Sequence, residues 1–427
     1  MHPAIRVAPV VLLTGCGSQA KPAPTWHGDV APLVAAHCWP CHAAEGVGPS
    51  FVEPESAQRW APAMAAAVSA RTMPPWLAAP MQDCAPPWTF EEDPRLDAAT
   101  IATFVAWAQA GGPLGDPAEA TTLPVVVGAD VLDANVSFGA DLEIPSDGED
   151  AVVCRDLGVL RSSPSWMLAA QVVARAPAVT HHAVVTLSAA PGPSDWTPCP
   201  GFVADADPIL FWAPGTGPLR VPEGAGVPLA ADQHLILQVH LHPLGVPGPY
   251  AAPEVQLVLT EESPARSASL WMVGDARDAS EGLLPGPGDG AAPTFRIPAG
   301  SVAHTETMEI TLPDRDDVLL WGIGHHMHRF GDAMATWWTH EGQTSCLLAT
   351  PEWQMDWHRL YLPEPAAPIR LTAGDTLRLR CSYRNDLDHP GAARAYAEAG
   401  VDGPVDVGLG TGPIDEMCLA LLGLVEP

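Results

Sequence analysis

The chain has 427 residues, of which 47% are apolar, and its formal net charge at pH 7 is -30. This length exceeds one ordinary domain, so we expect two to four domains. Only 20 basic residues stand against 50 acidic ones. Nucleic acid and anionic lipid surfaces bind through clustered Lys and Arg, so the composition argues against both as partners.

The first residues have the pattern of a targeting segment. Arg6 precedes a short apolar run that ends in Leu13-Thr14-Gly15-Cys16. These four residues resemble the lipobox of bacterial lipoprotein signal peptides, in which the Cys is acylated and becomes the mature N-terminus. The run is too short to span a bilayer. We therefore predict a signal peptide over 1–16, lipidation of Cys16 and a tether over 17–25. The protein would lie in the bacterial cell envelope, facing the periplasm or on the outer surface, and touch the membrane only through this lipid.

Helices are expected after the tether. Asp29 can cap a helix that runs into Cys38, and the Ala-rich stretch from Glu55 to Arg71 is a second candidate. The third helix is the clearest, because Asp97 can cap it and Gly111-Gly112 can end it. A Pro-containing linker would follow it over 113–123.

A haem-attachment motif, Cys38-Trp39-Pro40-Cys41-His42, lies at the end of the first helix. In C-x-x-C-H the two thiols form thioethers with the haem vinyl groups, and the His supplies the proximal imidazole. The alternatives are a structural zinc site or a chance match. Zinc would need two more ligands at a suitable spacing, and no second C-x-x-C lies nearby. We predict one covalent haem c.

The sixth haem ligand is expected to be a soft side chain some tens of residues later. Met73 fits, because Pro74-Pro75 would hold it on a stiff loop outside any helix. Met64 and Met81 are the rival candidates. The segment resembles the small cytochrome c domains that precede bacterial redox enzymes, which implies a small all-α haem domain over 26–116.

The remaining chain reads as β-structure. Five apolar segments separated by Pro, Gly and Asp predict strands: Ala183 to Leu187, Leu235 to Leu241, Val255 to Thr260, Val318 to Gly324 and Thr376 to Tyr383. About 300 residues of this pattern suggest two all-β units, each a sandwich or jelly roll. We place them at 125–264 and 265–427.

Histidines gather at three places in the β region. They are the adjacent His181 and His182, the pair His240 and His242, and the group His325, His326 and His328; one thioether, Met417, lies further on. Residues two apart share a face of a strand and can chelate one metal. Adjacent residues can do so only at a strand end or bulge. Imidazoles suit copper or zinc, and a thioether shifts the preference to copper.

The order of these motifs resembles one enzyme family over residues 125–427. His-His, then L-Q-V-H, then H-x-H-x-x-G, then D-E-M-C is the order found in the copper type II, ascorbate-dependent monooxygenases, which include peptidylglycine hydroxylase and dopamine β-hydroxylase. All four motifs occur here in that order, and Ile209 to Gly215 also resembles the family. The resemblance implies two jelly-roll-like domains that face each other across a solvent-filled cleft, with one copper ion on each.

The resemblance also implies a role for each ligand. His181, His182 and His240 would hold the electron-storing copper, and His326, His328 and Met417 the copper at which O2 reacts with a substrate C–H bond. Spacing alone would also nominate His242 and His325. The family has no ligand at these two positions, so we leave both out as neighbours of the ligands or surface residues.

Two positions depart from the peptide-amidating members of the family. The arginine that reads the substrate carboxylate is replaced by Gly324, and a tyrosine that follows the Met is replaced by Leu421. A peptide-glycine substrate is therefore not expected. We expect a less polar small organic substrate.

Six cysteines remain after lipidation and haem attachment, an even number that suits disulfides in an exported chain. The resemblance pairs Cys154 with Cys199 and Cys381 with Cys418. Cys84 and Cys346 are left over, and their pairing would clamp the haem segment to the copper module.

The sequence thus predicts a copper-dependent monooxygenase that uses O2 and receives electrons through its haem. Family members without a haem take these electrons from ascorbate. Here we expect an external redox protein or an ascorbate-like reductant to reduce the haem, which would pass electrons to the copper at His181, His182 and His240. The alternative is a non-catalytic redox or copper-binding lipoprotein.

Overall fold

The computed structural model describes residues 22–426, except 44, 45, 47, 121–131, 200–205, 244, 287–288, 290–291, 313–316 and 358. The predicted signal peptide and Cys16 lie outside the described residues, as does part of the predicted linker. Within the described ranges, no helix has both the length and the apolar character needed to cross a membrane.

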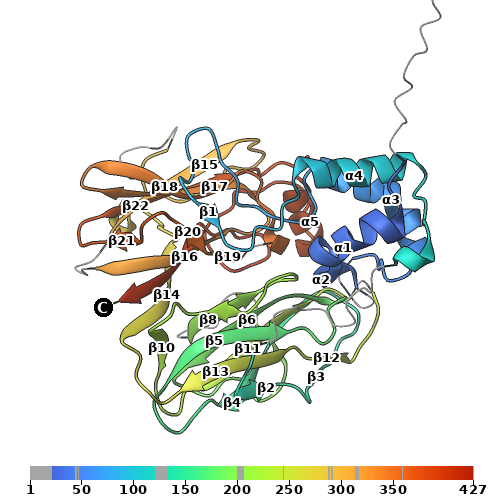
Figure 1. Cartoon of the computed structure of the whole chain (residues 1–427). Helices are drawn as coiled ribbons and strands as arrows, with labels where there is room; N and C mark the ends of the chain where they lie inside the picture. The colour runs from blue at the N-terminus through green and yellow to red at the C-terminus, as the bar shows by residue number, and fades with distance from the viewer. Residues whose placement is uncertain are drawn as a thin grey trace, which may run out of the picture.

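The N-terminal part contains short helices around a small core (Figure 1, blue to cyan). They are a π-helical turn over Trp26–Val30, α1 (Ala31–His37), α2 (Trp39–His42), α3 (Pro54–Ser69) and α4 (Ala98–Gln109). Trp26, Phe104 and Trp107 are fully buried between them. Asp97 caps α4 as expected, since its carboxylate accepts a hydrogen bond from the amide of Thr100. The first cap is Thr25 rather than Asp29.

The predicted fold class is wrong. The described residues are mostly β, in several sheets, and contain no sizeable all-α cytochrome-like domain. The 26–116 segment fails as an all-α unit because residues 72–97 are extended rather than helical. Prolines in this stretch cannot donate helical hydrogen bonds. Instead, β1 (Thr89–Phe90) pairs with β20 (Pro363–Glu364) of the C-terminal β region, and Leu77 and Phe90 join its core.

The first β region, which we call the N-half (132–264), has its own core between two sheet layers. One layer has the order β7-β4-β11-β6-β8, and β5, β13 and β2 belong to the other. Its strands are β2 (Val136–Phe138), β3 (Glu143–Ile144), β4 (Ala151–Val159), β5 (Ser165–Val173), β6 (Thr180–Ser188), β7 (Thr197–Pro198), β8 (Ala206–Trp212), β9 (Leu219–Arg220), β10 (Ala225–Leu229), β11 (His234–Leu241), β12 (Tyr250–Ala251) and β13 (Glu254–Thr260).

The second β region, the C-half (265–426), also has two layers, β15-β22-β17-β18 and β19-β16-β23-β14. Its elements are β14 (Arg266–Gly274), β15 (His304–Thr311), β16 (Val318–His326), β17 (Gly331–His340), β18 (Gln343–Thr350), β19 (Leu360–Tyr361), β20, β21 (Ile369–Leu371), β22 (Thr376–Tyr383), helix α5 (Pro390–Ala399) and β23 (Leu419–Glu426). All five strands predicted from the sequence are present across the two halves.

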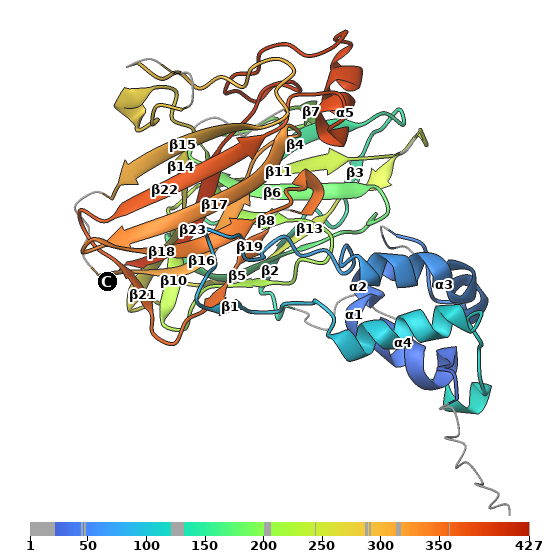
Figure 2. The same ribbon diagram turned by 90° about the horizontal axis from the view of Figure 1, so that it is seen from above.

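The two halves have separate cores but share one sheet. A single ten-stranded sheet runs through both, because β10 of the N-half pairs in parallel with β14 of the C-half. Val221, Ala225, Ala268 and Val425 form a small core at this seam. Elsewhere the halves face each other, with the C-half above the N-half in Figure 1 and the short helices at one end (Figures 1 and 2).

Three disulfides are present among the described residues, one within each half and one between the N-terminal part and the C-half. Cys154 is bonded to Cys199 and Cys381 to Cys418, as the family resemblance implied. Cys84 is bonded to Cys346, which anchors the extended segment between α3 and α4 to the C-half. Cys38 and Cys41 are not in disulfides. Disulfides of this kind are typical of exported proteins.

Candidate functional site

Three histidines of the N-half converge at a bulge between β6 and β11. His240 lies opposite His182 and Leu241 opposite Thr180, so His181 is the extra residue of β6. A bulge re-aims one side chain, which allows two adjacent histidines to point to the same place. One ligand atom from each of His181, His182 and His240 lies within 4.8 Å of those of the other two. We call these residues the three-His set.

One ring nitrogen of the three-His set, Nδ1 of His240, is buried and has no hydrogen-bond partner among the described residues. His240 donates from Nε2 to Asp150. His181 Nε2 lies 2.7 Å from Asp356 Oδ1, and its Nδ1 is 3.1 Å from Nδ1 of His182. An orphaned buried imidazole nitrogen is costly unless something binds it. The donor set therefore fits copper or zinc, and nothing in it distinguishes the two.

Two carboxylates orient the three-His set, and they come from different halves. Asp150 of the N-half contacts both His240 and His242, whereas Asp356 belongs to a short 3-10 turn of the C-half, Met355–Trp357. Burial opposes the charged form of Asp150, but the hydrogen bonds from His240 and His242 outweigh it and lower the pKa of this carboxyl. Burial lowers the pKa of His240, which keeps it in the neutral form that binds metals.

A second set of candidate ligands lies where β16 ends and β23 begins. His326 is the last residue of β16 and pairs with Leu419, so Met417, two residues before Leu419, is brought alongside. The rings of His326 and His328 are 5.3 Å apart. His328 donates from Nδ1 to the carbonyl of Asp415 at 2.9 Å, which leaves Nε2 with the lone pair. We call His326, His328 and Met417 the His/Met set.

Glu416 fixes the backbone around the His/Met set. Its carboxylate is fully buried and accepts hydrogen bonds from the amides of His328, Phe330 and Met417 at 2.8–2.9 Å. Burial raises the pKa of Glu416 to about 8, although the three amides favour its charged form. Tyr383 donates to the carbonyl of Met417, and the Cys381–Cys418 disulfide lies beside it. The thioether is therefore held by its neighbours on both sides.

A cavity of about 500 Å³ between the halves is lined by members of both ligand sets. His182 and His240 contribute from the N-half, and His326, His328 and Met417 from the C-half. The other lining side chains include Gln238, Arg329 and Glu398. This arrangement gives two distinct donor sets access to one shared space.

The two histidines left out as ligands have other partners. His325 is buried between the hydroxyls of Thr350 and Thr336 at 3.0 and 2.9 Å, and burial lowers its pKa to about 3. His242 lies 2.8 Å from the Asp150 carboxylate that also contacts His240. Both therefore support neighbouring structure through their ring nitrogens.

Gly324 allows no side chain. A Cβ at this position would lie 2.9 Å from the carbonyl oxygen of Arg359, which belongs to the backbone and cannot easily give way. A small cavity of about 20 Å³ beside His326 is lined mainly by apolar side chains, including Phe211, Met272 and Leu421. The surroundings of His326 on this side are thus apolar.

The C-x-x-C-H motif spans the start and the body of α2. His42 donates from Nδ1 to the carbonyl of Pro49 at 2.9 Å, which leaves Nε2 for a metal and fixes the tautomer. Gly48 is packed against this imidazole so closely that a Cβ would clash with it. Burial raises the pKa of the Cys38 thiol to about 12. These residues fit thioether attachment and proximal ligation of a haem.

Met73 lines the same cavity as Cys38, Cys41 and His42. The rival Met64 is buried in the core of the short helices, and Met81 packs against the Cys84–Cys346 disulfide. The cavity measures about 120 Å³, which is less than a porphyrin occupies. A haem attached here would extend beyond it or displace the partly exposed Met73 loop.

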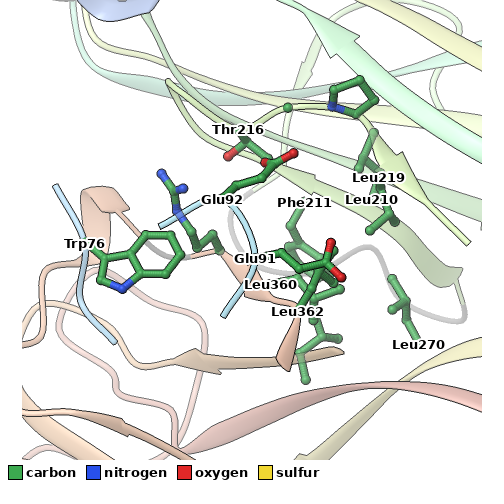
Figure 3. Close-up of a pocket in the computed structure, with 14 residues that line it drawn as sticks. Trp76, Glu91, Glu92, Leu210, Phe211, Thr216, Leu219, Leu270, Leu360 and Leu362 are labelled. Carbon is green, nitrogen blue, oxygen red and sulfur yellow. The ribbon is translucent and has the colours of Figure 1, made fainter. Parts of the chain in front are cut away.

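The haem-motif cavity borders both β halves. Gly215 of the N-half and Arg359 of the C-half line it, and Arg359 also stacks over Trp76 at 5.4 Å. Figure 3 shows the adjoining cavity of about 60 Å³, where Glu91 and Glu92 meet leucines from both halves. The motif therefore sits at the junction of three parts of the chain.

Sequence reasoning missed the residues that hold the ligands. Asp150 lies 90 positions from His240, and Asp356 lies in a turn without a motif, so neither had a recognisable signal. Glu416 was visible inside D-E-M-C but carried no assigned role. Such contacts depend on tertiary placement rather than on local pattern.

No protein-family profile and no curated protein sequence matches this chain. Solved structures resemble it only weakly. An allantoicase structure aligns over 52% of this chain and 74% of its own at 9% identity, with a TM-score of 0.15. A structure of infectious bursal disease virus Gx strain aligns over 69% of this chain and 75% of its own at 9% identity, with a TM-score of 0.18. The tandem CBM22 domains of Paenibacillus barcinonensis Xyn10C align over 69% of this chain and 98% of their own at 10% identity, with a TM-score of 0.16. Scores this low carry no argument about fold or function.

Proposed function

We propose that this protein is a copper-dependent monooxygenase that hydroxylates a C–H bond of a small organic substrate. The main support is that members of two different donor sets, His182 and His240 on one side and His326, His328 and Met417 on the other, line one cavity of about 500 Å³. Resemblance to the copper type II, ascorbate-dependent monooxygenases rests on the order of the same residues in the sequence. A storage protein has no need of two unlike sets around a shared space.

The overall reaction would be R–H + O2 + 2 electrons + 2 protons giving R–OH + H2O. Copper, when bound, would supply the one-electron steps and the activation of O2. His181, His182 and His240 would hold one ion through imidazoles whose orientation Asp150 and Asp356 fix. His326, His328 and Met417 would hold the other, and the mixed donor set favours copper over zinc.

The substrate would be less polar than a peptide. Gly324 leaves no room for a charged side chain that could read a carboxylate. Phe211, Met272 and Leu421 offer apolar contacts beside His326. A small molecule with an apolar group near the reacting carbon would suit this side of the cavity.

A covalent haem at Cys38, Cys41 and His42, with Met73 as the sixth ligand, would deliver the electrons. Gly215, next to Cys41 in the haem-motif cavity, follows β8, and Trp212 of β8 pairs with Ala183, the neighbour of His182. An external donor would reduce the haem, which would then reduce the copper at the three-His set. Attachment within one chain keeps the carrier close to its acceptor.

Export and lipid anchoring belong to the same proposal. The lipobox-like Cys16 motif would place the protein in the bacterial cell envelope, and the three disulfides suit that environment. O2, a small organic substrate and an external redox donor would be its partners.

Oxygen incorporation tests the proposed reaction directly. The copper-loaded protein is incubated with a reductant, ¹⁸O2 and a panel of small apolar compounds, and products are searched by mass spectrometry for one added ¹⁸O. Zinc-loaded protein is the control and should give none. Copper binding at both sets without substrate-dependent oxygen uptake across the panel would favour the alternative, a non-catalytic redox or copper-binding lipoprotein.

The haem relay has its own test. Haem staining after denaturation should be positive for protein from a host with cytochrome c maturation and lost in Cys41→Ser; a colourless wild type would contradict it. Met73→Ala should change a low-spin spectrum to high-spin. Reduced haem should then be reoxidised by copper within one chain, at a rate that does not depend on protein concentration. If copper-loaded and copper-free protein keep the haem reduced equally long without oxygen, the relay is wrong.

A further inference from the structure

A line of four charged side chains connects the two ligand sets, and three of them, Asp150, Glu398 and Arg329, line the 500 Å³ cavity. Asp150, which contacts His240, lies 3.2 Å from Arg394 of α5. Arg394 is 2.7 Å from Glu398, one turn further along α5. Glu398 in turn lies 3.2 Å from Arg329, the residue that follows His328 in the chain. The line begins in the N-half and ends in the C-half.

Helix α5 is seated directly on the turn that carries His328. Gly391 is packed against the carbonyl of Arg329, where a Cβ would come within 2.1 Å of the oxygen. Tyr396 contacts Phe330, with ring centroids 5.4 Å apart. His389 caps the helix by accepting from the amide of Ala392. A displacement of α5 would therefore displace the turn at 328–330.

The position of α5 suits a brace between the halves. The shared sheet joins them at the β10–β14 seam, and α5 lies away from this seam in both views (Figures 1 and 2). Rocking about such a seam would change the separation of the two ligand sets. A contact on the opposite side resists that motion more effectively than one beside the seam.

We propose that α5 is a strut that fixes the separation of the three-His set and the His/Met set, with Arg394 and Glu398 as positioning residues. The inference rests on the proposed function only for the expected change in copper affinity, not for the mechanical link between the two sets. Partly exposed ion pairs such as these contribute little to overall stability one by one. Their effect is expected instead at the two ends of the line, where Asp150 and Arg329 adjoin ligands.

The experiment compares Arg394→Gln with Arg378→Gln in the full mature chain. Arg378 pairs with Glu309 at 2.7 Å on the outer sheet of the C-half, so it is a matched control away from the cavity. Hydrogen exchange of metal-free protein should be roughly tenfold faster near residues 150–152 and 328–330 in Arg394→Gln, and unchanged in Arg378→Gln. Copper affinity at the three-His set, followed by Cu(II) paramagnetic resonance, should fall roughly 3- to 10-fold.

Glu398→Gln separates a strut from a local contact, because Glu398 does not touch Asp150. Transmission along the line requires faster exchange at both ends in this variant too, and Arg394→Lys should restore part of the protection. If Glu398→Gln leaves residues 150–152 unchanged, or if Arg394→Gln affects neither end, the strut is wrong. If the hydrogen exchange of the variants changes as expected but even the wild-type protein binds no copper, the proposed function is overturned and the strut is not.

Discussion

The two ligand sets are built in opposite ways. In the three-His set, all ligands lie on paired strands of one sheet, and carboxylates hold the imidazoles from outside. In the His/Met set, the ligands lie at a strand end and in the loops beside it, where one buried carboxylate, Glu416, holds their backbone. The three-His set is therefore held rigid by its sheet, and the His/Met set by the hydrogen bonds that Glu416 accepts.

This difference suggests a division of labour. Three imidazoles oriented by two carboxylate partners would hold a cation in a fixed geometry. A His/His/thioether set facing a cavity leaves space for a reacting molecule beside it. The second set is therefore the expected place of chemistry, and the first the expected place of electron storage.

The largest effect should follow from removing the thioether. Met417→Ile keeps an apolar side chain of similar size but loses the sulfur ligand, so product formation should fall by more than about 100-fold. Copper at the three-His set should remain, because Asp150 and Asp356 orient its imidazoles independently of the Met417 thioether. Product analysis and copper quantification by paramagnetic resonance would check both. Full activity in this variant would show that the His/Met set is not where the substrate reacts.

Much of the site could be predicted from the sequence, because ligand chemistry is local. The H-x-H and D-E-M-C motifs are visible as patterns, although His328 lies beyond the end of β16 rather than on the strand. The adjacent His181 and His182 raised the need for a bulge or a strand end, and the structure has the bulge. The carboxylates that orient the ligands come from distant turns and could not be found this way.

The fold was less accessible. Alternation and turn residues located five strands correctly, since half-buried strands carry that pattern. The all-α prediction for 26–116 failed because a Pro-rich extended segment, 72–97, is stabilised by β1–β20 pairing and by the Cys84–Cys346 disulfide, both long-range contacts. The sheet shared by both halves depends on the β10–β14 pairing, which has no signature within either strand.

Removal of each disulfide should affect the two ligand sets differently. The Cys154–Cys199 and Cys381–Cys418 pairs are separated by 45 and 37 residues, so each loss should cost a similar stability, about 4 kcal/mol from loop entropy. Copper binding should respond differently, because Cys418 adjoins Met417 whereas Cys154 lies on a strand beside β11. Thermal unfolding and copper titration of the two double-Ala variants would check this. Equal loss of both copper sites in both variants would contradict separate construction.

A smaller effect is expected at Asp356, which reaches His181 from the opposite half. Asp356→Ala should weaken copper binding at the three-His set roughly tenfold, because an orienting carboxylate is lost. The His/Met set should be unaffected. Competitive titration with a chelator of known affinity would measure each site. An unchanged three-His affinity would mean that its sheet alone positions His181.

His325 should matter for stability but not for copper. His325→Ala would leave the hydroxyls of Thr336 and Thr350 without this partner in the core, which should lower the free energy of unfolding by about 1–3 kcal/mol. Two coppers per chain should still bind. Loss of a copper from this variant, with the fold intact by circular dichroism, would instead make His325 a ligand.

His242 should give the smallest change, and it tests how much the three-His set depends on its surroundings. Its side chain is partly exposed and shares Asp150 with His240. In His242→Ala, Asp150 keeps its contacts with His240 and Arg394, so its orientation should persist. Copper affinity at the three-His set should therefore change by less than about threefold, a smaller effect than expected for a direct carboxylate partner. A loss of tenfold or more would show that the imidazole of His242 is needed to hold Asp150 in place, and the stiffness assigned to the sheet would then belong to this cluster.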